Sequence, residues 1–126
     1  MKHEEDDEQR ALIEWAELAS IGGIRVSEYL FAIPNGGKRN PKEAARMKGL
    51  GVKAGVSDLF LPVARGGYHG LWIEMKAKKG KTSEAQADWI NRMREQGYMA
   101  GVCHGWIPAK NTIKDYLEYK LLRLIP

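Results

Sequence analysis

Two apolar runs that carry acids at their ends constrain this chain more than any other feature. Asp58 stands at the start of one run, and Glu74 and Lys76 stand at the end of the next. Because strand side chains alternate between two faces, Glu74 and Lys76 emerge together while Met75 points the other way. If the two runs pair as a hairpin, Asp58 can lie beside Glu74, which places two carboxylates and one ammonium at a single spot.

This combination of charges indicates a particular chemistry. Two neighbouring carboxylates repel each other, and a divalent cation with oxygen ligands neutralises them. A lysine at the same spot can orient a water molecule or stabilise a phosphate, so the set is suited to metal-assisted phosphodiester hydrolysis. The alternative that composition alone leaves open is a surface cluster of salt bridges.

The charge of the chain is unevenly distributed. The 126 residues carry a net charge of +4, but residues 1–10 hold five acids and two bases, a net of −3, which leaves +7 on the remainder. A basic body favours a polyanionic partner such as DNA, because lysine and arginine neutralise phosphates; the alternative is solubility alone. The length suits one compact domain over residues 1–126, with residues 1–7 frayed or only loosely helical.

The sequence also gives an expectation about compartment. Cys103 is the only cysteine, so an internal disulfide is impossible, and its apolar neighbours predict a buried thiol. No apolar segment approaches the length that spans a bilayer, and the N-terminus is acidic, unlike a signal peptide. We therefore expect an intracellular protein with no membrane partner.

Hydrophobic periodicity, capping residues and glycines predict a mixed α/β fold. Helices are expected over residues 8–20, 41–48, 83–96 and 108–120, and strands over residues 28–33, 57–63, 70–77 and 98–104. The short turn between the second and third strands predicts an antiparallel pair, and the helix before the last strand allows a parallel pair. The expected outcome is a mixed β-sheet flanked by helices.

An ordered set of motifs makes the chain resemble the PD-(D/E)XK nuclease superfamily, and within it the virus-type replication-repair nuclease (VRR-NUC) family. The superfamily pattern is Asp58 followed by Glu74-Met75-Lys76, after a first helix that bears Glu14. The narrower features are Asn35-Gly36, Gly51-Val52-Lys53-Ala54-Gly55-Val56-Ser57-Asp58, Gln86-Ala87-Asp88-Trp89 and Gly97-Tyr98. The resemblance extends over about residues 8–119. Ser57 departs from the family's usual proline, which supplies no ligand, so only the local strand geometry is in doubt.

The resemblance implies a restriction-endonuclease-like core that hydrolyses DNA phosphodiesters with Mg²⁺ or Mn²⁺. It implies Asp58 and Glu74 as metal ligands, with the backbone carbonyl of Met75 as a further oxygen. Lys76 would orient the attacking water or stabilise the charge that develops on the phosphate.

Two further catalytic residues are expected from the same resemblance, each with an ordinary structural alternative. Glu14 is the expected acid of the first helix, near the metal directly or through water; Glu17 competes with it, and a solvated helix glutamate is the alternative. Gln86 is expected to reach the active site or the substrate phosphate, although as the last residue of a capping box it can simply bond backbone amides.

Basic and glycine residues around these motifs predict the DNA contacts. The expected DNA-binding residues are Asn35, Gly36, Lys38, Arg39, Lys53, Lys78, Lys79 and Lys81. Stand-alone members of the family, which include small phage proteins, look like Holliday-junction resolvases, so a homodimer acting on branched DNA is expected. For a phage protein the compartment would be the cytoplasm of a bacterial host. The alternatives are a flap or end-processing nuclease and a non-catalytic DNA-binding module.

Overall fold

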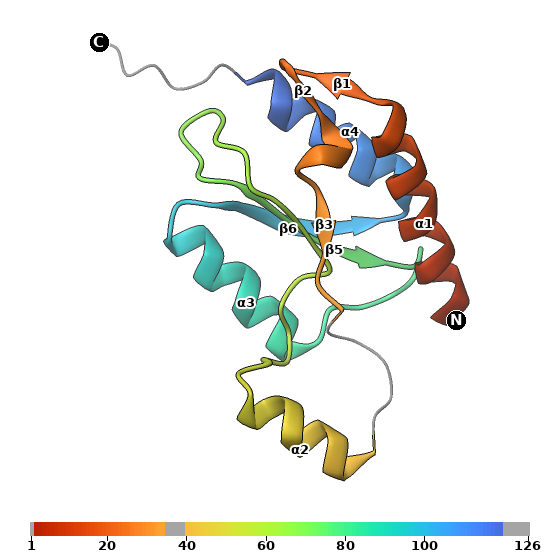
Figure 1. The fold of residues 1–126 in the computed structure, drawn as a ribbon, viewed down its shortest axis with the longest axis vertical. Coiled ribbons are helices and arrows are strands. Elements are labelled where there is room, and N and C mark those ends of the chain that lie inside the picture. Colours follow the sequence, from red (N-terminus) through yellow and green to blue (C-terminus); the bar gives the residue numbers. More distant parts are fainter. Residues whose placement is uncertain (1, 35–39, 120–126) are drawn as a thin grey trace.

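The computed structural model describes residues 2–34 and 40–119, and Figure 1 shows their arrangement. The helices are α1 (Lys2–Leu18), the 3₁₀ turn η1 (Val26–Glu28), α2 (Pro41–Gly49), α3 (Glu84–Glu95) and α4 (Trp106–Glu118). The strands are β1 (Ser20–Ile21), β2 (Ile24–Arg25), β3 (Phe31–Ala32), β4 (Leu59–Leu61), β5 (Leu71–Lys76) and β6 (Met99–His104). No helix within these residues is both long enough and apolar enough to cross a bilayer.

A mixed four-stranded sheet lies at the centre of the molecule, as the sequence predicts. Its strand order is β3-β4-β5-β6, with β4 antiparallel to β5 and β6 parallel to β5. The β4–β5 pairing runs from Leu61 opposite Leu71 to Leu59 opposite Ile73, and the ladder ends there. Asp58, the residue before Leu59, therefore lies just beyond the last pair of this ladder, next to the segment of β5 that continues to Lys76.

One face of the sheet forms the hydrophobic core with α1 and α4. Leu59, Leu61, Leu71, Ile73 and Met75 are all almost fully buried there. From the helices, Leu12, Ala16, Ile113, Tyr116 and Leu117 complete this layer. The buried hydroxyl of Tyr116 donates a hydrogen bond to the Val63 carbonyl at 2.6 Å, which satisfies its polar atom.

The opposite face carries aromatic side chains and then the charged residues. Phe60 stacks on Trp72 with ring centroids 4.1 Å apart, and Trp72 meets Trp89 of α3 edge to face at 5.4 Å. Because the side chains alternate, Asp58, Glu74 and Lys76 share this face. In Figure 1, α3 covers it on the side of β6, while α2 stands apart from the body of the molecule.

The beginning of the chain differs from the prediction. Residues 2–7 belong to α1, although a frayed or loosely helical segment was expected. Acids near a helix N-terminus are favoured by its dipole, and tertiary contacts add to this. The Glu4 carboxylate accepts a hydrogen bond from the Lys78 amide at 3.3 Å, and Glu8 accepts one from the Trp106 amide at 2.7 Å. The second contact caps α4, which begins two residues before its predicted start.

Short strands account for the remaining differences. The predicted strand 28–33 is reduced to β3, because its first residue lies in η1. Gly22-Gly23 turns the chain between β1 and β2 with φ of +60° and +87°. A Cβ at Gly22 would lie 2.2 Å from the Leu117 carbonyl oxygen, so no larger residue fits there. Strands of two residues leave too little pattern to predict.

Candidate active site

Asp58 is held in place by the strand that carries the other charged residues. Its Oδ2 accepts a hydrogen bond from the Met75 amide at 2.7 Å, and its own carbonyl accepts one from the Ile33 amide at 2.8 Å. The carboxylate is half-buried, and the preceding Ser57 is fully buried. Asp58 is thus fixed between β3 and β5, just beyond the last β4–β5 pair.

Glu74, Lys76 and Gln86 form one connected group. Glu74 is 2% exposed, and its Oε2 accepts a hydrogen bond from the Gln86 side-chain amide at 3.0 Å. The Lys76 ammonium lies 3.8 Å from the same oxygen and is also buried. Oε1 of Glu74 accepts no hydrogen bond from the N–H groups of the described residues, although the Asp58 carboxyl group lies within hydrogen-bonding reach of the Glu74 carboxyl group. Two buried carboxyl groups this close are costly unless a proton or a cation lies between them.

The two carboxyl groups perturb each other. Burial, followed by the negative charge of Asp58, raises the pKa of Glu74 to about 8, against the opposing effect of Lys76. Burial also raises the pKa of Asp58, while the hydrogen bond from the Met75 amide opposes the increase. Without a cation the pair holds a proton at neutral pH, and a bound cation would replace that proton.

The donor set fits a hard divalent cation. Within the described residues, no three or more His, Cys, Asp or Glu side chains could hold a metal on their own. Mg²⁺ does not need such a cage, because it is commonly bound by one or two carboxylates together with waters and substrate phosphates. The amide and carbonyl of a strand residue point to the same side of the strand, so the Met75 carbonyl faces the side on which Asp58 lies.

On α1, Glu5 rather than Glu14 lies where its charge acts on the carboxylate pair, with a smaller effect on the pKa of both groups than that of burial. The negative charge of Glu5 raises the pKa of both Asp58 and Glu74. A Cβ at Gly80, in the loop after β5, would lie 3.4 Å from Oε2 of Glu5, which places the glutamate beside this loop. Glu14 is exposed, as is the competing Glu17, and nine residues of helix put Glu14 about 13 Å further along the axis.

A helical-face argument would have found Glu5. It lies seven residues before Leu12 and eleven before Ala16, so all three share one face of α1. Leu12 and Ala16 are buried against the sheet. Glu14, two residues after Leu12, points elsewhere. The signal was missed because residues 1–7 were not expected to form a firm helix.

Gln86 makes both of the contacts considered for it: it completes the capping box of α3, and its side chain reaches Glu74. Its backbone amide donates to the Ser83 hydroxyl at 3.1 Å, and its side-chain oxygen accepts from the Ser83 amide at 2.9 Å, which completes the capping box. The side-chain nitrogen then donates to Glu74. The cap fixes the orientation of the amide, and the amide in turn fixes the carboxylate.

The expected DNA-binding residues fall into three groups. Asn35, Gly36, Lys38 and Arg39 lie outside the described residues. Lys78, Lys79 and Lys81 are exposed in the loop after β5, close to Lys76. Lys53 is exposed in the loop before Asp58 and lines a pocket between α2 and α3. The cationic residues that the structure describes therefore flank the carboxylate pair along the chain.

Comparisons with known proteins agree with this fold. The model of the VRR-NUC domain family matches residues 3–107. A solved structure described as a VRR_NUC domain protein is 32% identical, with a TM-score of 0.83 over 93% of this chain and 90% of that chain. No match was found among curated proteins.

The fold and the site define an α/β protein of the nuclease type, with a mixed sheet flanked by helices. The chain belongs to the VRR-NUC family, since the family model spans most of its length. The resemblance inferred from the motifs and the fold class inferred from periodicity are both confirmed.

Proposed function

We propose that this protein is a divalent-metal-dependent DNA endonuclease of the PD-(D/E)XK type, which hydrolyses phosphodiester bonds. One observation carries the proposal: Asp58, Glu74 and Lys76 meet at the end of the β4–β5 ladder, with two half-buried or buried carboxyl groups that share no N–H donor between them. Because the chain belongs to a nuclease family, phosphodiester hydrolysis is the reaction that we propose for this arrangement. A cluster of surface salt bridges would not bury Glu74 and Lys76 together.

The residues that would hold Mg²⁺ or Mn²⁺ are Asp58, Glu74 and the backbone carbonyl of Met75. Glu5 would add its carboxylate directly or through a water molecule. Such an ion, when bound, lowers the pKa of a coordinated water and offsets the charge of the phosphate. The raised pKa of Glu74, about 8, supports this assignment, because a site that favours a proton between two carboxylates also favours a cation there.

Lys76 and Gln86 have different tasks. The Lys76 ammonium lies on the same face as the carboxylates, where it can orient the attacking water or stabilise the negative charge that develops on the phosphate. Gln86 acts on Glu74, because its amide fixes the position of Oε2. Gln86 is thus a positioning residue, whereas Lys76 is a catalytic one.

The substrate that we propose is branched DNA such as a Holliday junction, cut by a homodimer. The net charge of +7 outside the first ten residues supports a polyanionic substrate. The described residues hold one Asp58–Glu74 pair at the end of the β4–β5 ladder, so two cuts on opposite strands would need two chains related by a two-fold axis. The expected compartment is intracellular.

Purified protein incubated with four-way junctions, flaps and plain duplex tests the proposal, with Mg²⁺, Mn²⁺ or EDTA in parallel. We expect the metals to support cleavage, EDTA to abolish it, and the junction to be cut in preference. Preferential cutting of flaps or ends would show that these structures, and not junctions, are the preferred substrate. Binding without cleavage under every condition would overturn the proposal of an endonuclease and indicate a non-catalytic DNA-binding module.

A further inference from the structure

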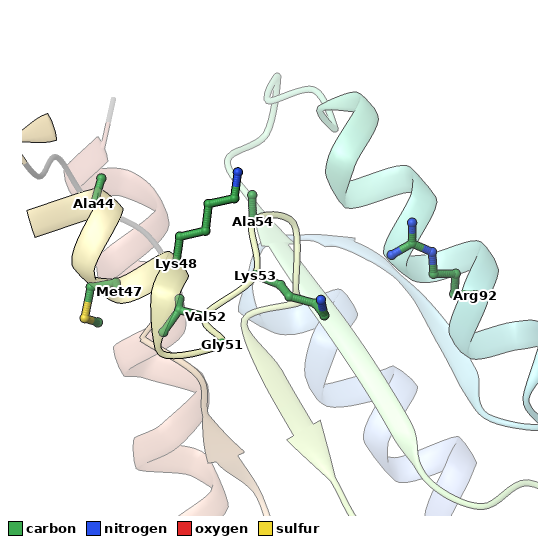
Figure 2. Close-up of a pocket in the computed structure, with 8 residues that line it drawn as sticks. All are labelled: Ala44, Met47, Lys48, Gly51, Val52, Lys53, Ala54 and Arg92. Carbon is green, nitrogen blue, oxygen red and sulfur yellow. The ribbon is translucent and has the colours of Figure 1, made fainter. Parts of the chain in front are cut away.

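A pocket of about 590 Å³ lies between α2 and α3, away from the carboxylate pair. Figure 2 shows its walls: α2 on one side, the loop with Val52, Lys53 and Ala54 at the centre, and Arg92 reaching in from α3. The opening is part of the surface rather than an internal void. Pockets of this size accept small organic ligands.

Every charged residue that lines this pocket, within the part of the chain that the structure describes, is basic. Lys48 of α2, Lys53 of the loop and Arg92 of α3 approach it from three different elements. None of the described residues that line it is acidic, and Lys48 and Arg92 form no ion pair with any described residue. Three basic side chains that approach one pocket favour an anionic ligand there.

The rest of the wall is apolar. Met47, Val52 and Ala54 provide it, and methionine adapts its shape to flat groups placed against it. α2 buries none of its residues, although it is a well-capped helix with Asn40 bonded to the Glu43 amide at 2.7 Å. This helix therefore contributes its pocket-lining residues to a surface and not to the core.

Gly55 connects the pocket to the end of the sheet where Asp58 and Glu74 lie. Its φ is +88°, and a Cβ would lie 2.4 Å from the Ala85 carbonyl oxygen, so the loop lies directly against the first turn of α3. The next residue of that turn is Gln86, which holds Glu74. Lys53 precedes Asp58 by five residues, so their Cα atoms are at most about 18 Å apart. This distance corresponds to about five nucleotides of a B-form strand.

We propose that this pocket receives one unpaired nucleotide of the DNA strand, close to the bond that is cut. The inference rests on the proposed function for the identity of the substrate. The phosphate would lie among Lys48, Lys53 and Arg92, and the base would pack on Met47 and Val52. The Arg92 guanidinium can also stack on a base.

An unpaired nucleotide fits these walls better than the alternatives. A phosphate alone would leave the apolar part of the pocket without a contact. A paired base cannot enter, because its faces are covered by the stack, whereas an extruded or single-stranded base exposes them. The pocket would therefore favour DNA in which pairing is interrupted near the scissile bond.

Binding measurements in EDTA test the pocket without cleavage. The probes are three short labelled duplexes: one fully paired, one with a single unpaired thymidine, and one with an unpaired abasic site in its place. Fluorescence anisotropy should show that the thymidine DNA binds about tenfold more tightly than the abasic DNA, the effect of one stacked base.

Two variants and two matched controls locate the effect. Met47→Gln and Arg92→Gln should each reduce the preference to roughly twofold or less, because each removes a face available to the base. Leu50→Gln replaces an apolar residue that follows α2, is 69% exposed and does not line the pocket. Lys114→Gln removes a positive charge from the distant helix α4. Both controls should retain the tenfold preference.

The outcomes separate this inference from the proposed function. Equal binding of thymidine and abasic DNA, or a preference that survives both pocket variants, would overturn the pocket. Absence of binding to all three duplexes would overturn it too. The nuclease is judged separately, by cleavage of branched DNA in Mn²⁺. A base preference without any cleavage would refute the nuclease and keep the pocket, and cleavage without a base preference would do the reverse.

Discussion

Two side chains on the same face of β5 differ in what they contribute to the reaction. In the proposed mechanism Glu74 would hold the cation, while the Lys76 ammonium cannot be a ligand and would orient the attacking water or stabilise the charge on the phosphate. We expect Lys76→Ala to lower cleavage by on the order of 100-fold or more, because it removes a group that stabilises the transition state. Mn²⁺ binding, measured by calorimetry, should remain. Asp58→Ala in the same assays should lose both, and cleavage by Lys76→Ala at nearly the wild-type rate would remove lysine from the mechanism.

The choice between the two glutamates of α1 can be tested directly. Glu5→Gln removes the negative charge that acts on Asp58 and Glu74, so Mn²⁺ affinity should fall by about tenfold, with cleavage falling alongside. Glu14→Gln is the matched control, because the same change is made on an exposed part of the same helix. Titration calorimetry with Mn²⁺ measures the affinity of both variants and so shows which glutamate contributes to metal binding. A loss with Glu14→Gln and none with Glu5→Gln would restore the assignment made from the motif.

Glu74 also predicts a dependence of stability on pH. Its pKa is about 8 in the folded chain and 4.5 for an ordinary glutamate, so the folded state retains a proton that the unfolded state has lost between these values. The unfolded chain then binds fewer protons, and the free energy of unfolding falls as pH rises from about 4.5 to 8. Urea unfolding in EDTA should show this decrease, and saturating Mn²⁺ should reduce it.

The comparison variant for this experiment is Glu74→Gln. It removes the titrating carboxyl, so the decrease above pH 4.5 should become much smaller, and the part that remains would come from Asp58, whose pKa burial raises. A wild-type protein whose stability in EDTA rises over the same interval would contradict the burial of an ionisable pair. So would a slope unchanged by the substitution.

At the scale of one element, the residue that completes the N-terminal cap of α3 also contacts the candidate active site. Gln86 closes the capping box with Ser83 and also donates to Glu74. Ser83→Ala should cost about 1 kcal/mol of stability and leave cleavage near normal. Gln86→Ala should cause a similar loss of stability and also lower cleavage by roughly tenfold or more, because Glu74 loses the group that positions it. Thermal melts and initial rates distinguish the two variants. Equal rates would show that Gln86 acts only as a cap.

The elements that the sequence predicted well are those with complete local signals. Asn40-Pro41 and Ser83 each start a helix with a side-chain cap, and both helices begin where these residues stand. The alternation along β5 places Glu74 and Lys76 on one face, and the β4–β5 turn sets the antiparallel pairing. Period and capping are local properties, so a single sequence contains them.

The features that were missed depend on contacts between distant segments. α4 starts at Trp106 because Glu8, 98 residues earlier, accepts its amide hydrogen. The position of Glu5 near the carboxylate pair depends on where α1 docks along the sheet, and the ribbon of β1 and β2 depends on Gly22 lying against Leu117. The sequence motif therefore located the carboxylates of the sheet, while the acid of α1 required the packing.

At the scale of the whole molecule, the number of active sites limits what one chain can do. The described residues contain one Asp58–Glu74 pair, at one end of the β4–β5 ladder. Paired cuts on opposite strands of a symmetric junction therefore require a second chain, and a two-fold dimer presents its sites with the matching symmetry. Light scattering should give a dimer at the concentrations at which junctions are cut. A monomer that nicks only flaps or ends would exclude the resolvase.

Mixed dimers test the same symmetry through the chemistry. Wild-type chains are combined with Asp58→Ala chains, which retain the dimer surface but lose a metal ligand, and the junction carries a different label on each of its cut strands. Because each chain serves one strand, a mixed dimer should make one nick and not the second, so singly nicked junctions accumulate as the share of variant chains increases. Lys114→Ala chains, mixed in the same proportions, should leave the paired cuts intact. Paired cutting that declines without any singly nicked product would mean that the two sites do not act independently, each on its own strand.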